Sequence, residues 1–173
     1  MSIRLETLNT VVAICLFDVK LKDFQIIGTG FLVDFNQKTY LVTNKHVIDN
    51  LDDLYLVFTG SEIIDNRYLR INNRNINYHK TIYHRNDDVD VAMIEIYEEL
   101  LLHIEISKVK ISTQSIKISE MIEKNFREGA EILVLGHPMN ISKLNNYYPV
   151  VRGGIISQIS NLFEKNYEIK INW

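Results

Sequence analysis

The sequence predicts an all-β protein. Its apolar segments are short and rich in Val, Ile, Tyr and Phe, and polar turns separate them. Seven such segments follow one another closely with few helical stretches, which is typical of a β-sandwich or β-barrel. With 173 residues, of which 46% are hydrophobic and 24% charged, the chain can bury a core as one domain or as two small lobes.

The first part of the chain carries the seven predicted strands. Asn36, Gln37 and Lys38 are expected to turn between the second and third strands, in the stretch VDFNQKTYLV. After the third strand, HVIDNL is expected to form one helical turn with Thr43 or Asn44 as its cap. The strands are predicted at Val11–Val19, Gln25–Asp34, Thr39–Thr43, Leu54–Phe58, Arg67–Ile71, Asn75–Tyr83 and Val91–Ile96.

The second part of the chain begins after a change in composition. Residues 112–128 are polar, tolerate a helix and show no alternation, as expected of a connector between lobes. We therefore expect an N-terminal domain at 1–111, a connector at 112–128 and a C-terminal domain at 129–173. Three further strands are predicted in the last of these, at Glu131–Leu135, Val150–Ile159 and Tyr167–Ile171.

Charge and apolar runs exclude some classes of function. A net charge of −3 argues against a protein built to hold nucleic-acid phosphates. The apolar run Val11–Phe17 is too short to span a bilayer and lacks a basic leader, so we expect a soluble, cytoplasmic protein that contacts no membrane. A single cysteine, Cys15, excludes an internal disulfide and fits a reducing compartment.

Three features match parts of a catalytic triad, which requires a base, an orienting carboxylate and a nucleophile. His46 follows a strand directly, where the backbone turns and an imidazole can face a cleft. Asp90 heads an apolar strand in NDDVDVAMIEI, where a half-buried carboxylate can accept the imidazole N–H. Further on, GAEILVLGHPM and VVRGGIISQI form a strand, a turn and a glycine-hinged strand. Each feature alone is weak evidence for a triad, because it is common in other proteins. The three together, in this order, are less common.

These segments, with GTGFLV and YLVTNKHVI, resemble the bacterial trypsin-like serine peptidases of the chymotrypsin fold, including the HtrA type, over residues 10–172. The resemblance implies two β-barrels, with the N-terminal barrel complete and the C-terminal barrel incomplete. It also implies His46 as the general base and Asp90 as its orienting carboxylate, with no metal or other cofactor. Asp87 and Asp88 compete with Asp90, but neither is followed directly by the apolar alternation.

The nucleophile expected from this resemblance is missing. The family places its serine in a Gly-Asn-Ser-Gly-Gly-like turn, and no serine of the chain has that context. Ser157, in GGIISQI, comes nearest but falls on the strand before the expected site, and Cys15 is also misplaced. The stretch NYEIKINW resembles the strand that leads toward the nucleophile loop, which would place the serine beyond Trp173.

Three explanations remain open, taken in order of preference. The polypeptide is a truncated or split serine endopeptidase that is inactive alone, or it is a non-catalytic pseudo-peptidase that binds a peptide or protein. In the third, it pairs through open strand edges with a complementing chain or with itself. Each implies a peptide or protein partner and no nucleic acid.

Other histidines suggest simpler roles. The spacing of His79 and His84 suits neither a helical metal pair nor one face of a strand, so we expect surface or turn residues. His137, in the sequence Gly-His-Pro, is expected to serve the turn. The mixture RYLRINNRNINYHK is interpreted as an exposed hairpin rather than an RNA surface.

Overall fold

The structure is a computed structural model. It describes residue 8 and residues 10–49, 51–58, 68–72, 79–101, 128–138, 149–160 and 168–172. The chain divides into two compact units, one of residues 1–113 with 136–150 and the other of residues 114–135 with 151–173. The domain boundaries expected from the sequence stay predictions, and nearly all of the connector at 112–128 lies outside the described residues. Within the described part, no helix is both long and apolar enough to cross a membrane.

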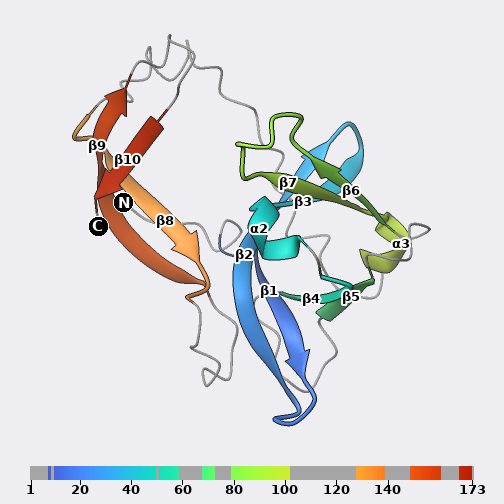
Figure 1. Cartoon of the computed structure of the whole chain (residues 1–173). Helices are drawn as coiled ribbons and strands as arrows, with labels where there is room; N and C mark the ends of the chain where they lie inside the picture. The colour runs from blue at the N-terminus through green and yellow to red at the C-terminus, as the bar shows by residue number, and fades with distance from the viewer. Residues whose placement is uncertain are drawn as a thin grey trace. The chain divides into compact units, whose positions relative to one another are not determined.

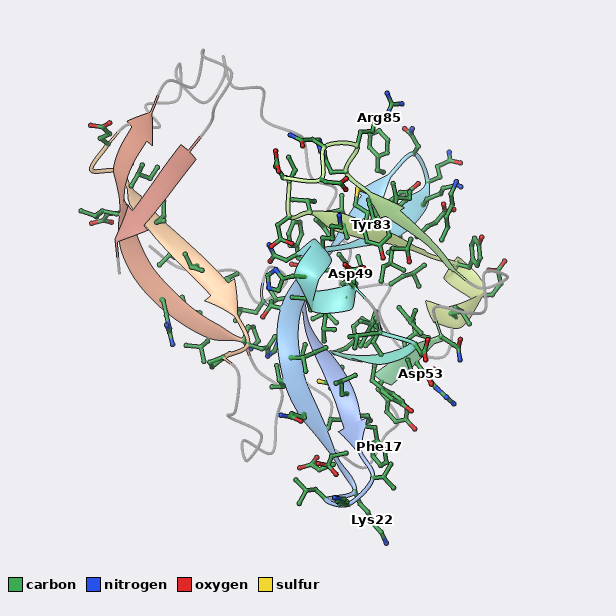
Figure 2. All side chains as sticks on the ribbon, viewed as in Figure 1. Phe17, Lys22, Asp49, Asp53, Tyr83 and Arg85 are labelled. Atoms are coloured by element: carbon green, nitrogen blue, oxygen red, sulfur yellow. The ribbon has the colours of Figure 1, made fainter. Side chains whose placement is uncertain are left out.

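The first unit contains a seven-stranded sheet that curls into a half-barrel (Figure 1). The strands lie in the order β5-β4-β1-β2-β3-β7-β6, and every printed neighbour pair is antiparallel. In Figure 1, β1 and β2 form a long curved ribbon, and Figure 2 shows Phe17 and Lys22 toward its tip. The bounds are β1 Val11–Asp18, β2 Asp23–Phe35, β3 Lys38–Thr43, β4 Asp53–Phe58, β5 Tyr68–Asn72, β6 His79–Tyr83 and β7 Ala92–Ile96.

All seven strands expected in this part of the chain are present, with ends within two residues of those predicted, except that β6 is described only from His79. The expectation of a complete barrel is confirmed only as far as a half-barrel. Among the described residues, β5 and β6 are the two edges of the sheet.

The turn between β2 and β3 is one residue shorter than predicted. Asn36 and Gln37 have φ values of 50° and 62°, and Phe35 pairs directly with Lys38 across the turn. Two central residues with positive φ match the right-handed twist of an antiparallel hairpin, so two residues suffice. Lys38 therefore belongs to β3, where its Nζ lies 2.5 Å from Oε1 of Glu95 on β7.

The core of the first unit follows from the period-two alternation of its strands. On β1, Val12 and Ile14 join the main core. Ala13 and Cys15 point to the opposite face and form a smaller cluster with Ile26 and Val57. Both faces of β1 are therefore buried, which explains its uninterrupted apolar sequence. Burial raises the pKa of the Cys15 thiol to about 12, with a smaller contribution from Asp23.

The second unit holds a three-stranded sheet in the order β10-β9-β8, and its three strands are those that the sequence predicted. Its strands are β8 Glu131–Gly136, β9 Val150–Ser160 and β10 Glu168–Asn172. The turn before β8 is tied to β9 by two backbone bonds, Gly129 N to Ile156 O at 2.7 Å and Ile156 N to Ala130 O at 3.0 Å. The incomplete C-terminal barrel stays a prediction.

Candidate functional site

A short helix, α2 (Lys45–Ile48), places His46 at the end of β3. Its apolar residues Val47 and Ile48 are buried, whereas His46 is exposed. The helix lies close against β2, because a Cβ built on Gly28 would lie 2.4 Å from Cγ1 of Val47. Only a residue without a side chain fits there, and this gives the first glycine of GTGFLV a structural purpose. The backbone thus enters α2 with His46 on the solvent side.

The loop between β6 and β7 carries Asp90 to the same place. Ala92, the first residue of β7, pairs with Thr43, the last residue of β3. The residues just before β7 therefore lie beside those just after β3. The loop is also closed on itself by backbone bonds, including Val89 N to Asn86 O at 3.1 Å and Val91 N to Val89 O at 2.9 Å.

Both oxygens of the Asp90 carboxylate bind His46. Nδ1 of the imidazole lies 2.5 Å from Oδ2, and the backbone N–H of His46 donates to Oδ1 at 2.9 Å. The backbone bond is the main cause of the lowered pKa of Asp90. Desolvation, the second-largest effect, opposes it, and the ring of His46 and the side chain of Asn44 lower the pKa further. An ionised carboxylate can only accept a hydrogen bond, so Nδ1 of His46 carries the hydrogen and donates it in this pair.

The second ring nitrogen of His46 is open to its surroundings. Nε2 has no hydrogen bond to any residue within the described ranges, and the side chain is 71% exposed. The ring thus has one nitrogen fixed by a carboxylate and the other free to exchange a proton. That asymmetry is what a general base requires.

Neither residue that the sequence suggested as the cap of α2 makes a side-chain cap hydrogen bond. Asn44 occupies the N-cap position with extended backbone, φ −76° and ψ 143°, but makes no side-chain cap bond. Its Nδ2 instead donates to the backbone oxygen of Asp90 at 3.0 Å and to Oδ2 at 3.2 Å. Thr43 donates its hydroxyl to the backbone oxygen of Thr29 at 2.9 Å. Asn44 is therefore the N-cap residue by position, as predicted, but neither side chain makes the cap hydrogen bond, because each has a partner elsewhere.

The other two acids of the loop have different surroundings. Asp87 lies 3.0 Å from Nζ of Lys45 through Oδ1, and its side chain is 93% exposed. The backbone N–H of Asp88 donates to Oδ1 of Asn86 at 3.1 Å. Among the three candidate carboxylates, the structure therefore brings Asp90 to His46. The catalytic roles of these two residues stay predictions.

The remaining histidines bear on the metal question. Nδ1 of His84 accepts the backbone N–H of Asn86 at 3.1 Å, which makes it a loop residue as expected, and the side chain of His79 lies outside the described residues. In the described ranges, no group of three or more His, Cys, Asp or Glu residues is placed to hold a metal ion.

His137 does more than serve a turn. Its backbone N–H donates to Oγ1 of Thr29 at 2.8 Å, and its side chain is only 6% exposed. Nε2 is buried without a partner among the described residues. Burial lowers the pKa of His137 to about 4, against the opposing effect of a hydrogen bond with the backbone of Val11. The role of His137 in a turn stays a prediction, and its burial was not predicted, because nothing local to Gly-His-Pro reveals what covers it.

The described residues do not identify a nucleophilic serine. Seven of the nine serines lie outside the described residues. Ser157 and Ser160 fall in β9, but their side chains are outside the described set. Cys15 is buried in the smaller apolar cluster, so its thiol is no substitute.

Comparisons with known proteins find a family match and a similar fold. A model of the family described as "Trypsin-like peptidase domain" matches residues 28–172. A similar solved structure is the crystal structure of the MamO protease domain from Magnetospirillum magneticum in its apo form, with a TM-score of 0.53 and 13% sequence identity. The match covers 90% of this chain and 64% of that one, so the chain spans less than two thirds of that structure. A search of curated protein sequences finds no match.

Proposed function

Because the chain belongs to the trypsin-like peptidase domain family, we propose that His46 and Asp90 are the general base and the orienting carboxylate of a serine endopeptidase site. The observation that carries the proposal is the two-point contact of the Asp90 carboxylate with the ring and the backbone of His46. Two contacts define both the position and the plane of the carboxylate. They hold the imidazole in the tautomer that leaves Nε2 able to accept a proton.

The proposed chemistry follows from that tautomer. Nε2 of His46 accepts the proton of a serine hydroxyl as the serine oxygen attacks a peptide carbonyl, and returns it to the leaving amine nitrogen. The same nitrogen then deprotonates the water that hydrolyses the acyl-enzyme. Throughout, Asp90 stabilises the imidazolium cation, which its lowered pKa permits because the carboxylate stays ionised.

The serine is the part of the site that these 173 residues do not provide in the expected form. No serine of the sequence has the Gly-x-Ser-Gly context that also supplies oxyanion donors. We therefore expect no substantial peptidase activity from this polypeptide by itself. In this proposal the seven-stranded half-barrel and the three-stranded sheet belong to the two barrels of a chymotrypsin-like fold. The nucleophile comes from residues outside these two sheets.

The histidine–aspartate pair is tested first, without any assay of activity. The Nδ1 proton of His46 should give a downfield NMR signal in the native protein, as expected for a short bond to a carboxylate. Asp90→Asn should abolish that signal. Asp87→Asn removes the same charge from the same loop without touching the ring, so it should preserve the signal. A wild-type spectrum without an Asp90-dependent proton overturns the proposed pair.

Activity is tested second. The pure chain is incubated with a fluorophosphonate probe and with a panel of fluorogenic peptides, and we expect neither labelling nor turnover. Covalent labelling of a serine, or hydrolysis that His46→Ala abolishes, would show that the chain carries its own nucleophile. A polypeptide that extends or complements the chain with a Gly-x-Ser-Gly turn should gain labelling, and His46→Ala should remove it. If the extended or complemented polypeptide shows neither labelling nor peptide hydrolysis, the enzymatic role is refuted.

A second candidate function rests on the missing serine turn. The chain would then be a non-catalytic pseudo-peptidase that binds a peptide or protein segment. Replacement of His46 by Ala distinguishes the two cases. If the chain is a binding module, His46→Ala should bind a partner identified by pull-down with the same affinity as the wild type. If it is a peptidase, His46→Ala should abolish the activity of the reconstituted enzyme.

A further inference from the structure

Asn44 touches the carboxylate that orients His46. Its Nδ2 lies 3.0 Å from the backbone oxygen of Asp90 and 3.2 Å from Oδ2 of the same residue. Both partners are hydrogen-bond acceptors, so the amide must present its NH₂ group and not its oxygen. One side chain thus holds the main chain and the carboxylate of Asp90 at once.

The position of Asn44 suits this contact. It is the single residue between the last residue of β3 and the first of α2, and its backbone is extended. Thr43 on one side is fixed to β2 through the backbone oxygen of Thr29, and the helix on the other side is packed through Val47. The amide therefore projects from a segment that is secured at both ends.

A third donor, from a residue other than His46, further restrains the orientation of the carboxylate. The terminal torsion of an aspartate is broad, and its two oxygens exchange by rotation. The bonds from His46 hold one oxygen each, but both come from the same residue of α2. Asn44 adds donors from outside that residue and also ties down the backbone of Asp90.

The other link between this loop and α2 is weaker. Lys45 meets Asp87 at 3.0 Å, but the Asp87 side chain is 93% exposed. An exposed ion pair contributes little to holding a loop. The link also lies three residues away from Asp90 in the sequence, so it does not define the plane of that carboxylate.

We infer that Asn44 is a positioning residue, which holds the main chain and carboxylate of Asp90 so that Nδ1 of His46 keeps its proton. This inference rests on the proposed function, since it assigns a role within that site. The contact between Asn44 and Asp90 can be measured in the chain as it exists, because the measurement requires no catalytic activity.

Two substitutions of similar size test it. Asn44→Leu removes the donor, and Asn44→Asp replaces it with a second carboxylate beside Asp90. In Asn44→Leu we expect the downfield Nδ1 proton to broaden and the ring ¹⁵N shifts to show a mixture of tautomers. Exchange of the His46 backbone amide should accelerate by roughly two- to fivefold, the range for an exposed interaction. A ¹³C titration should show the pKa of Asp90 raised, and raised further in Asn44→Asp because of charge repulsion.

Asn86→Leu is the matched control. It changes an asparagine of the loop before β7 whose side chain accepts the backbone N–H of Asp88. Its His46 tautomer and Asp90 titration should match the wild type. If Asn44→Leu lowers only the free energy of unfolding and moves neither of these signals, Asn44 is merely structural and the inference is overturned.

The design separates two failures. A wild-type chain without an Asp90-dependent Nδ1 proton sinks the proposed function and this inference together. A wild-type chain that shows this proton, with Asn44 variants that leave it unchanged, sinks only the role of Asn44.

Discussion

Replacement of Gly28 by alanine should destabilise the first unit and disturb His46 at the same time. Gly28 lies on β2 opposite α2, and a Cβ at this position would lie 2.4 Å from Cγ1 and 2.9 Å from Cγ2 of Val47. Ordinary contact begins near 3.4 Å, so Val47 has to retreat by about 1 Å. A valine has little rotamer freedom in a helix, so the retreat must move α2 itself.

The cost follows from overpacking in a closely packed core. Extra carbon atoms forced into such a site typically cost about 1–3 kcal/mol of folding free energy. Alanine would otherwise favour the strand slightly over glycine, by about 0.5–1 kcal/mol, so the clash must outweigh that gain. We expect a net destabilisation of about 1–2 kcal/mol.

Urea unfolding measures the change, and two variants control it. Gly153→Ala in β9 adds a Cβ that meets no heavy atom within 4 Å, so its unfolding midpoint should equal or exceed that of the wild type. Val47→Ala removes both clashing methyl groups. The double variant Gly28→Ala/Val47→Ala should therefore be no less stable than Val47→Ala alone, a coupling that a double-mutant cycle reports.

The same samples test the link to the site. Because α2 carries both Val47 and His46, Gly28→Ala should weaken the downfield Nδ1 proton of His46, and Val47→Ala in the double variant should restore it. Unchanged stability in Gly28→Ala, or a loss that the second substitution leaves uncorrected, would refute the packing argument.

Three further predictions concern the core of the first unit. His137 has a folded-state pKa of about 4, whereas its ordinary value is 6.5. The free energy of unfolding should therefore be highest above pH 6.5 and should fall by about 3 kcal/mol as the pH is lowered toward 4, because the folded state keeps His137 neutral. Urea unfolding of His137→Phe at several pH values should show a flatter pH dependence than the wild type. Cys15, with its pKa raised to about 12, should resist iodoacetamide at pH 8 in the native protein and react once urea unfolds it, and rapid native labelling would contradict its burial. Leu41→Ala removes a fully buried side chain from the main core and should cost about 2–5 kcal/mol in urea unfolding, and a much smaller loss would show that the core is loosely packed there.

The strands were predictable because their signal is local. Alternating apolar residues and β-branched side chains identify a strand within a few positions, and the polar turns bound it. The exception at Lys38 is instructive. Asparagine and glutamine at positive φ close a hairpin in two residues, so the third polar residue returns to the strand and meets Glu95.

Half of the candidate site was predictable for a similar reason. His46 and Asp90 each occupy a recognisable sequence context, and the choice of Asp90 over Asp87 agrees with the contacts in the structure. Asn44 was interpreted as a helix cap, since asparagine before a helix usually is one. Its actual partners come from the end of a loop 46 positions away, and no local pattern encodes them.

By itself, the sequence determined the strand-rich architecture and the family, and it selected His46 and Asp90, which the structure places in contact. Tertiary structure alone decided which side chains meet: Asn44 with Asp90, Val47 with Gly28, and Thr29 with His137, which is 108 positions distant. The physical reason is that hydrogen bonds and close contacts depend on strand register and on the curl of the sheet. Both arise from the packing of the whole unit, and a short stretch of sequence does not specify them.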